Sequence, residues 1–122
     1  MRTGLPALAL LISLAACGGP PVDMPQLAEA TAERYLQAWQ SADWDHIYRL
    51  EGREPENRSV LHKSLTDRLE FFHITEVRYA ESSAVCAVTL RWRSPAGTYS
   101  ESGELYLQRH GPDWQVWGYR NF

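Results

Sequence analysis

The second half of the 122-residue chain is a series of alternating segments separated by turn sequences, and this pattern constrains the fold more than any other. From Ala84 to Trp92 an apolar side chain stands at every second position, as is typical of a strand with one buried face. The alternation slips at Thr75-Glu76, which predicts a β-bulge, and Gly103 predicts a kink. The pattern predicts a meander of four antiparallel strands, at residues 72–79, 84–93, 98–108 and 114–119.

Helical periodicity replaces this alternation earlier in the chain. Between residues 26 and 40 apolar side chains recur three and four positions apart, with charged and polar residues between them. Asp43 is a good N-cap for a second helix over residues 44–50, and Gly52 suits the end of that helix.

A third helix is predicted after Ser59, because Leu61, Leu65 and Leu69 are spaced four residues apart. Helices followed by a run of strands are typical of an α+β fold. We therefore expect N-terminal helices packed on one face of a four-stranded antiparallel sheet.

The first residues of the chain have the composition of a secretory signal peptide. Arg2 precedes an apolar run from Leu5 to Leu14, which is shorter than the roughly 20 residues that cross a bilayer. The tetrapeptide Leu14-Ala15-Ala16-Cys17 resembles the lipobox of bacterial lipoproteins. The resemblance implies a diacylglyceryl group on the Cys17 sulfur, cleavage before Cys17 and acylation of the new amino terminus. The alternative is an ordinary signal peptide cleaved after Ala16.

A segment rich in proline and glycine follows the cysteine. Three prolines and two glycines in residues 18–25 predict an extended tether rather than a helix. The residue after Cys17 is Gly18 rather than Asp, which by resemblance to lipoprotein sorting rules implies the periplasmic side of the outer membrane. The expected division is a signal peptide at 1–16, a lipidated cysteine with its tether at 17–25, and one domain at 26–122.

Charge and cysteine content narrow the classes of function. The chain has 12 Lys and Arg against 15 Asp and Glu, and Arg2 leaves with the signal peptide, so the net charge becomes 11 − 15 = −4. An acidic domain of this kind is not expected to bind nucleic acid. With Cys17 lipidated, Cys86 has no partner in the chain; a buried inert thiol is expected, with a redox role or an intermolecular disulfide as alternatives. No metal or cofactor motif is expected, because the histidines are scattered: His46, His62, His73 and His110.

Two stretches resemble the nuclear-transport-factor-2-like superfamily, also described as cystatin-like or SnoaL-like. Ala32-Glu33-Arg34-Tyr35-Leu36-Gln37-Ala38-Trp39, followed by Ala42-Asp43-Trp44-Asp45, is similar to its first helix and the step into its second. The stretch from Gly103 to Val116 is similar to its closing hairpin. The resemblance covers roughly residues 26–119 and implies a cone of helices against a curved antiparallel sheet. Members include ketosteroid isomerases, dehydratases, polyketide cyclases and non-catalytic modules, so the fold alone does not decide the function.

The resemblance also bears on catalysis. In the isomerases a tyrosine of the first helix donates to a developing oxyanion, and Tyr35 stands at the matching place. Those enzymes need a carboxylate base in an apolar setting after the second helix, whereas this chain has an exposed, charged stretch from Glu51 to Arg58. Nearby arginines are expected to keep its acids, Glu51, Glu54 and Glu56, ionised. No catalytic residue is assigned.

Six side chains are candidates for an apolar ligand pocket between the helices and the sheet: Tyr35, Trp39, His73, Trp92, Tyr106 and Trp117. The alternative for the aromatic residues is ordinary core packing, and the alternative for His73 is a packed or surface position.

The sequence therefore predicts a membrane-anchored envelope lipoprotein without catalytic activity, which binds a small apolar ligand or a protein partner. The partner could be a second copy of the chain or another envelope protein. The alternative is a small cofactor-free isomerase or dehydratase that uses Tyr35 with His73 or a carboxylate.

Overall fold

The computed structural model describes residues 24–52, 59–61, 63 and 66–122. The expected signal peptide, Cys17 and most of the tether lie outside the described residues. Among the described helices, none is long and apolar enough to cross a membrane.

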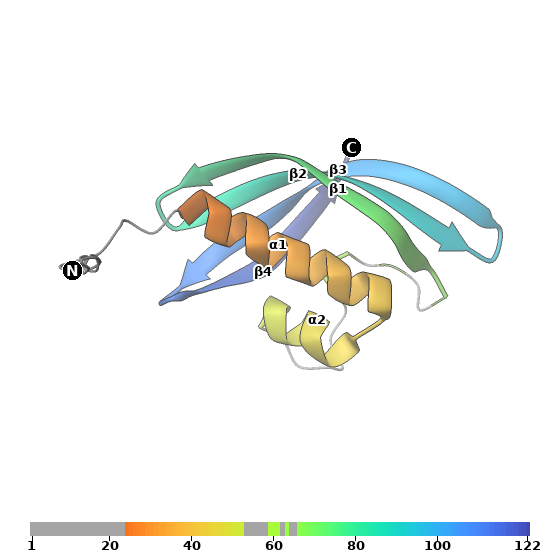
Figure 1. The fold of residues 1–122 in the computed structure, drawn as a ribbon, viewed down its shortest axis with the longest axis horizontal. Helices are drawn as coiled ribbons and strands as arrows, with labels where there is room; N and C mark the ends of the chain where they lie inside the picture. The colour runs from red at the N-terminus through yellow and green to blue at the C-terminus, as the bar shows by residue number, and fades with distance from the viewer. Residues whose placement is uncertain (1–23, 53–58, 62, 64–65) are drawn as a thin grey trace, which may run out of the picture.

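The described part of the chain has the α+β architecture that the sequence predicts: two helices pack against a four-stranded antiparallel open sheet with strand order β1-β2-β3-β4. Figure 1 shows the sheet arching over α1, with α2 on the same side as α1. The elements are α1 Met24–Ser41, α2 Trp44–Glu51, β1 Arg68–Ala80, β2 Ser83–Ser94, β3 Gly97–His110 and β4 Asp113–Asn121. Helix α1 begins two residues earlier than predicted, because a proline such as Pro25 is tolerated in the first turn of a helix.

Capping residues bound α2 at both ends, as predicted. The Asp43 side chain accepts a hydrogen bond from the backbone N–H of His46 and starts α2. Gly52 has φ +67° and ends α2, and its N–H donates to the carbonyls of Tyr48 and Arg49. The two caps therefore fix where α2 begins and where it ends.

The predicted third helix is wrong in the part of its span that the structure describes. Ser59, Val60 and Leu61 are buried but not helical, and Leu69 already belongs to β1, where it pairs with Trp92 of β2. A spacing of four places leucines on one side of a helix, but it is also compatible with a turn at the first leucine and a strand at the last. Leu65 lies outside the described residues.

The strands form a simple meander, and the pairing of β1 with β2 contains two register shifts. One register shift lies between Leu69 and Phe71, and another between Ile74 and Glu76 confirms the predicted slip. Gly103 pairs with Val88 in an uninterrupted ladder. Its lack of a side chain instead admits Tyr119, because a Cβ at Gly103 would lie 2.5 Å from the Tyr119 hydroxyl.

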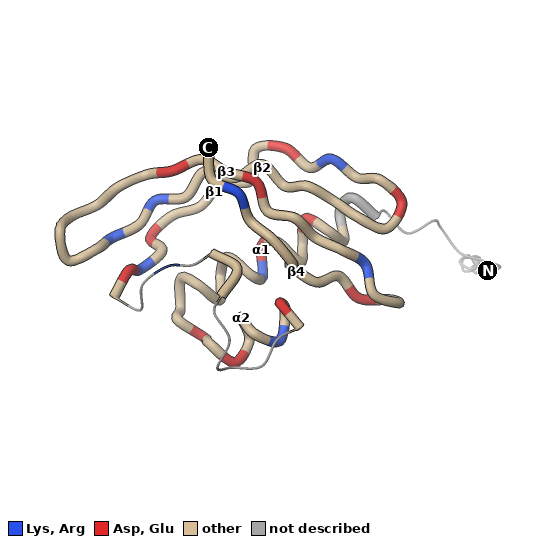
Figure 2. The backbone as a smooth tube through the Cα atoms, turned by 180° about the vertical axis from the view of Figure 1, so that it is seen from behind, with Lys and Arg blue, Asp and Glu red and all other residues tan. Residues whose placement is uncertain are grey.

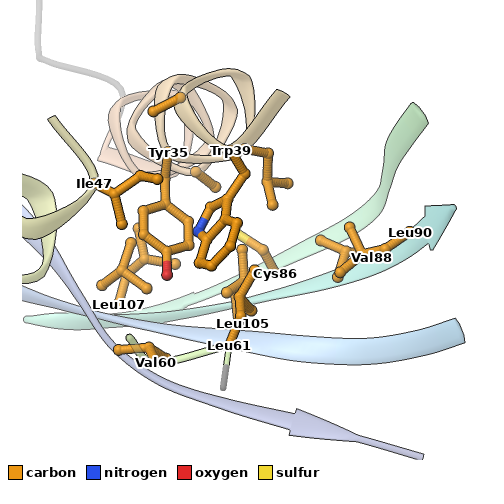
Figure 3. Close-up of a cluster of buried hydrophobic side chains, with 14 of the residues drawn as sticks. Tyr35, Trp39, Ile47, Val60, Leu61, Cys86, Val88, Leu90, Leu105 and Leu107 are labelled. Carbon is orange, nitrogen blue, oxygen red and sulfur yellow. The ribbon is translucent and has the colours of Figure 1, made fainter. Parts of the chain in front are cut away.

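The core lies between α1 and the face of the sheet that α1 covers. Large side chains from both layers are fully buried there, and Figure 3 shows Tyr35 and Trp39 of α1 pointing down among the leucines and valines of the strands. Alternate residues of β2, from Ala84 to Trp92, supply the middle of this layer. We call the face of the sheet against α1 the inner face, and the opposite one the outer face.

Candidate functional site

A buried polar pair joins the two helices. The hydroxyl of Tyr35, on α1, donates a 2.5 Å hydrogen bond to Oε2 of Glu51, the last residue of α2. The same carboxylate oxygen accepts from the N–H of Val60 at 3.1 Å and from the Ser59 hydroxyl at 3.3 Å. Tyr35 is fully buried and Glu51 is 5% exposed. We call Tyr35, Glu51 and Ser59 the Tyr35 cluster.

The expectation of an exposed Glu51 is therefore wrong. The sequence neighbours of Glu51 are charged, but its position on α2 is one turn after the buried Ile47, so both side chains lie on the covered side of the helix. This helical spacing was the signal that could have found it. Glu54 and Glu56 lie outside the described residues.

The cluster holds Tyr35 in its neutral, donating form. Burial of the ring raises the pKa of Tyr35 well above its usual range, and the negative charge of Glu51 and the hydrogen bond to it act in the same direction. A neutral phenol beside a carboxylate is an arrangement that general acid–base chemistry can use, provided that a substrate reaches it.

Three of the six predicted pocket residues do come together on the inner face. Trp39 forms edge-to-face contacts with Tyr35 and Trp92, with ring centroids 6.5 and 5.7 Å apart. All three side chains are buried, at 3% exposure or less. The rings pack directly against one another, as side chains of a filled core do.

The other three lie on the outer face, so the expectation that all six share one hollow is wrong. Tyr106 alternates with the buried Leu105 and Leu107, and its ring stacks on that of Trp117, 5.6 Å between centroids. A register shift between Tyr106 and Leu107 alters the pairing with β4 at this point. His73 is exposed between Phe72 and Ile74, which pack against the core.

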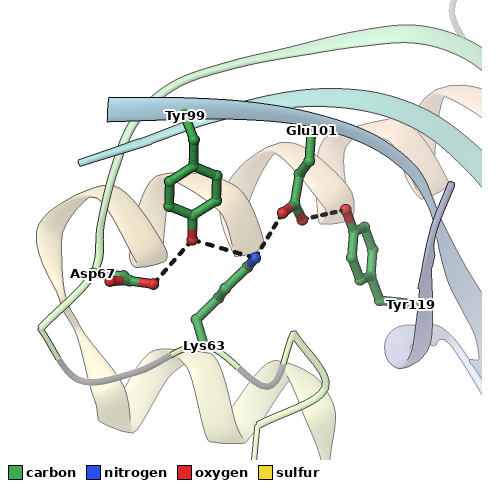
Figure 4. Close-up of polar contacts among 5 residues, drawn as sticks. All are labelled: Lys63, Asp67, Tyr99, Glu101 and Tyr119. Atoms are coloured by element: carbon green, nitrogen blue, oxygen red, sulfur yellow. Dashed lines mark hydrogen bonds and ion pairs between the residues drawn. The ribbon is translucent and has the colours of Figure 1, made fainter. Parts of the chain in front are cut away.

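A second polar cluster, which the sequence did not reveal, lies where β3 and β4 meet the segment before β1 (Figure 4). Lys63 pairs with Glu101 at 2.6 Å, and the other carboxylate oxygen of Glu101 accepts from the Tyr119 hydroxyl at 2.6 Å. The Tyr99 hydroxyl donates to Asp67 at 2.9 Å. We call Lys63, Asp67, Tyr99, Glu101 and Tyr119 the Lys63 cluster.

The ammonium of Lys63 forms cation–π contacts with two aromatic rings in addition to its ion pair with Glu101. Its ammonium lies 5.1 Å from the centroid of Trp92 and 5.2 Å from that of Tyr99. Burial alone would lower the pKa of Lys63, but the hydrogen bond and charge of Glu101 outweigh it, and the pKa is raised. Burial, with the hydrogen bond to Glu101, also raises the pKa of Tyr119. The cluster therefore holds a protonated lysine rather than a nucleophilic amine.

The outer face of the sheet carries exposed aromatic residues and paired charges. Trp117 is 56% exposed, Phe71 54% and Phe122 71%. Beside Trp117, Glu104 bridges Arg78 at 2.7 Å and Arg120 at 3.7 Å. Figure 2 shows acidic and basic positions interspersed along the strands rather than gathered by sign.

Neither a metal site nor a reactive thiol emerges from the described residues. No group of three or more His, Cys, Asp or Glu there is arranged to hold a metal ion. Cys86 is free and fully buried, and its burial raises the pKa of the thiol to about 11.

Comparison with known proteins adds no assignment: no protein-family model, curated protein or solved structure matches the chain.

Proposed function

We propose that the chain is an envelope lipoprotein, anchored through lipid on Cys17, whose nuclear-transport-factor-2-like domain is a non-catalytic binding module. Its docking surface is the outer face of the sheet, and the occupant is a second copy of the chain. The tetrapeptide ending at Cys17 supports the anchor, and helices on one side of a curved antiparallel sheet support the domain type.

One observation carries the docking surface: Trp117, with more than half of its side chain exposed, stacks on Tyr106 on the face that neither helix covers. Exposed tryptophan and tyrosine are enriched where protein surfaces meet. The inner face, by contrast, is occupied by packed rings, which favours a protein partner over an apolar ligand in the hollow.

Size and charge favour a second copy as the occupant. Four strands of this length present a face on the order of 700 Å², close to the roughly 800 Å² that each partner buries in a stable interface. The Arg78–Glu104–Arg120 row carries both signs and can complement itself across a twofold axis. Two chains anchored in one membrane also meet at a raised effective concentration.

The test is cross-linking in the envelope of the host with a flexible bismaleimide. Ser102→Cys places a thiol on the outer face, where Ser102 is exposed opposite Thr89. Gln37→Cys, exposed on α1, is the matched control. We expect cross-linked dimer only from Ser102→Cys, and its loss when Trp117→Arg is added. Equal cross-linking from both positions, or none from Ser102→Cys, would contradict the proposal.

The enzyme alternative rests on the short hydrogen bond between Tyr35 and Glu51. A cofactor-free isomerase needs such a donor beside a carboxylate, but here both groups are buried and Oε2 of Glu51 already accepts three hydrogen bonds. The test is conversion of a β,γ-unsaturated ketone to its conjugated isomer, followed by absorbance. Turnover by the native protein that is lost in Tyr35→Phe would establish the enzyme alternative.

A further inference from the structure

A depression of about 270 Å³ lies where α1, α2 and β4 meet, and its lining shares no residue with the Tyr35 or the Lys63 cluster. Its lining comes from all three elements: Arg34, Arg49, Leu50, Asp113, Trp114 and Gln115. The volume is close to the lower limit for small-molecule sites, so it suits a compact ligand.

The two arginines of this depression differ from four arginines of the sheet in that they form no ion pair with a described carboxylate. Every arginine that forms an ion pair with a described carboxylate lies on a strand: Arg78, Arg91, Arg93 and Arg120. Arg34 has a 3.5 Å contact with the Thr31 hydroxyl, and neither Arg34 nor Arg49 forms an ion pair with a described residue. Two guanidinium groups that no described carboxylate pairs with, around one depression in an acidic protein, are well placed to take an anion.

The other lining residues indicate which uncharged groups the ligand can carry. Trp114 is 5% exposed, and its Nε1–H has no acceptor among the described residues. Leu50 and Trp114 are the apolar residues of the lining, and Gln115 adds a polar one. The Gln115 side chain packs against Gly52, where an added Cβ would lie 2.6 Å from its amide nitrogen, so the end of α2 fixes this wall.

Charge balance limits how negative the ligand can be. Asp113 places one carboxylate in the lining, and the carbonyl end of α2 also disfavours negative charge. Two guanidinium groups against one carboxylate leave a single positive charge for the ligand to neutralise. We propose that this depression binds a monoanionic carboxylate with a compact apolar body, the carboxylate between Arg34 and Arg49 and the body against Leu50 and Trp114.

The test uses the processed lipoprotein in zwitterionic detergent micelles, with phenylacetate as the probe. The five tryptophans give separate indole N–H signals in NMR spectra, and Trp114→Phe identifies the one that belongs to Trp114. We expect phenylacetate to shift this signal saturably, and Arg34→Gln or Arg49→Gln to weaken the apparent affinity about tenfold or more, as loss of a charge-assisted hydrogen bond does. Arg93→Gln removes the same charge from the sheet and should leave the affinity unchanged.

Two further ligands make the test decisive. Phenethylamine has the same ring with the opposite charge, and inorganic phosphate has negative charge without an apolar body. Neither should shift the Trp114 signal saturably in the range where phenylacetate does. The proposal is overturned if phenylacetate gives no saturable shift, if either arginine variant binds it as well as the native chain, or if either comparison ligand binds equally well.

Discussion

The hydroxyl of Tyr35 and Oε2 of Glu51 lie 2.5 Å apart inside the core and tie the middle of α1 to the last residue of α2. Because the same oxygen accepts the N–H of Val60, the pair also fixes the backbone at Val60. A buried carboxylate has lost its hydrating water and is stabilised by such donors instead. Removal of one donor therefore lowers the stability of the fold.

Tyr35→Phe removes only the donor hydroxyl of this pair. We expect the free energy of unfolding to fall by roughly 1–3 kcal/mol, as for a hydrogen bond to a buried charged group. Urea denaturation followed by circular dichroism measures the change. Tyr48→Phe, on the half-buried side of α2, is the control and should cost less than about 0.5 kcal/mol. An equal decrease in the free energy of unfolding of the two variants would show that the Tyr35 hydrogen bond does not stabilise the fold more than an ordinary tyrosine hydroxyl does.

Lys63 and Glu101 should be energetically coupled. Their side chains are 15% and 9% exposed, so Lys63→Met leaves Glu101 without its cation in a largely buried site. We expect Lys63→Met to cost roughly 1–3 kcal/mol, and Lys63→Met with Glu101→Gln to cost less than the sum of the single changes. The pair Arg78–Glu104, whose arginine is 55% exposed, should show a coupling below about 1 kcal/mol in the same double-mutant cycle. Additive effects at Lys63 and Glu101 would contradict the expectation.

Stability should fall at alkaline pH, beginning with Cys86. Burial raises the pKa of this thiol from 9.0 to about 11, so above pH 9 the unfolded chain releases a proton that the folded chain keeps. The free energy of unfolding then declines as the pH rises, by about 1–2 kcal/mol up to pH 11. Tyr35, Lys63 and Tyr119, whose pKa values are also raised, add to the decline above about pH 10. Urea titrations in the window from about pH 9 to 10 should show a flatter dependence for Cys86→Ala; an unchanged slope would rule out the thiol as its cause.

The thiol content of the mature protein tests the anchor. If Cys17 carries lipid through its sulfur, the denatured protein purified from its host envelope should give one reactive thiol per chain with a disulfide reagent, and Cys86→Ala should give none. Before denaturation the Cys86 thiol should react very slowly, because it is fully buried. Two thiols per denatured chain would show that Cys17 is unmodified and that the signal peptide is of the ordinary kind.

Gly103→Ala should disturb the Lys63 cluster by direct contact with Tyr119. The new methyl group would lie 2.5 Å from both the Tyr119 hydroxyl and the carbonyl oxygen of Arg120. We expect a loss of roughly 1–3 kcal/mol from this overpacking, measured by urea denaturation. Adding Tyr119→Phe should not restore stability, because the backbone carbonyl remains in the way. Ser102→Ala, the neighbour on the outer face, should be close to neutral and serves as the control.

Alternation predicted the sheet well because each strand has one face against the helices. The β1 slip was visible in the sequence, since a bulge reverses the faces of all residues beyond it. The third helix failed for a different reason. Leu61 and Leu69 are both buried, but one reaches the core from a turn and the other from a strand, and equal spacing does not distinguish these routes.

The candidate site was only half visible in the sequence. Tyr35 and Trp39 are neighbours on one side of a helix, so their meeting was predictable from the helical period. Tyr106 could have been separated from them, because it is out of phase with Leu105 and Leu107 on β3. The Lys63 cluster assembles from three separate segments, and no local pattern brings such residues together.

Lys63 is the only lysine of the chain, and its ammonium is enclosed by Glu101 and two aromatic rings. If the amino terminus is acylated, as the resemblance to a lipobox implies, this is also the only primary amine of the mature protein. Reagents that acylate amines would then report on one defined site. Their rate of reaction would measure how often the contact between Lys63 and the end of the sheet opens, in solution or in the intact envelope.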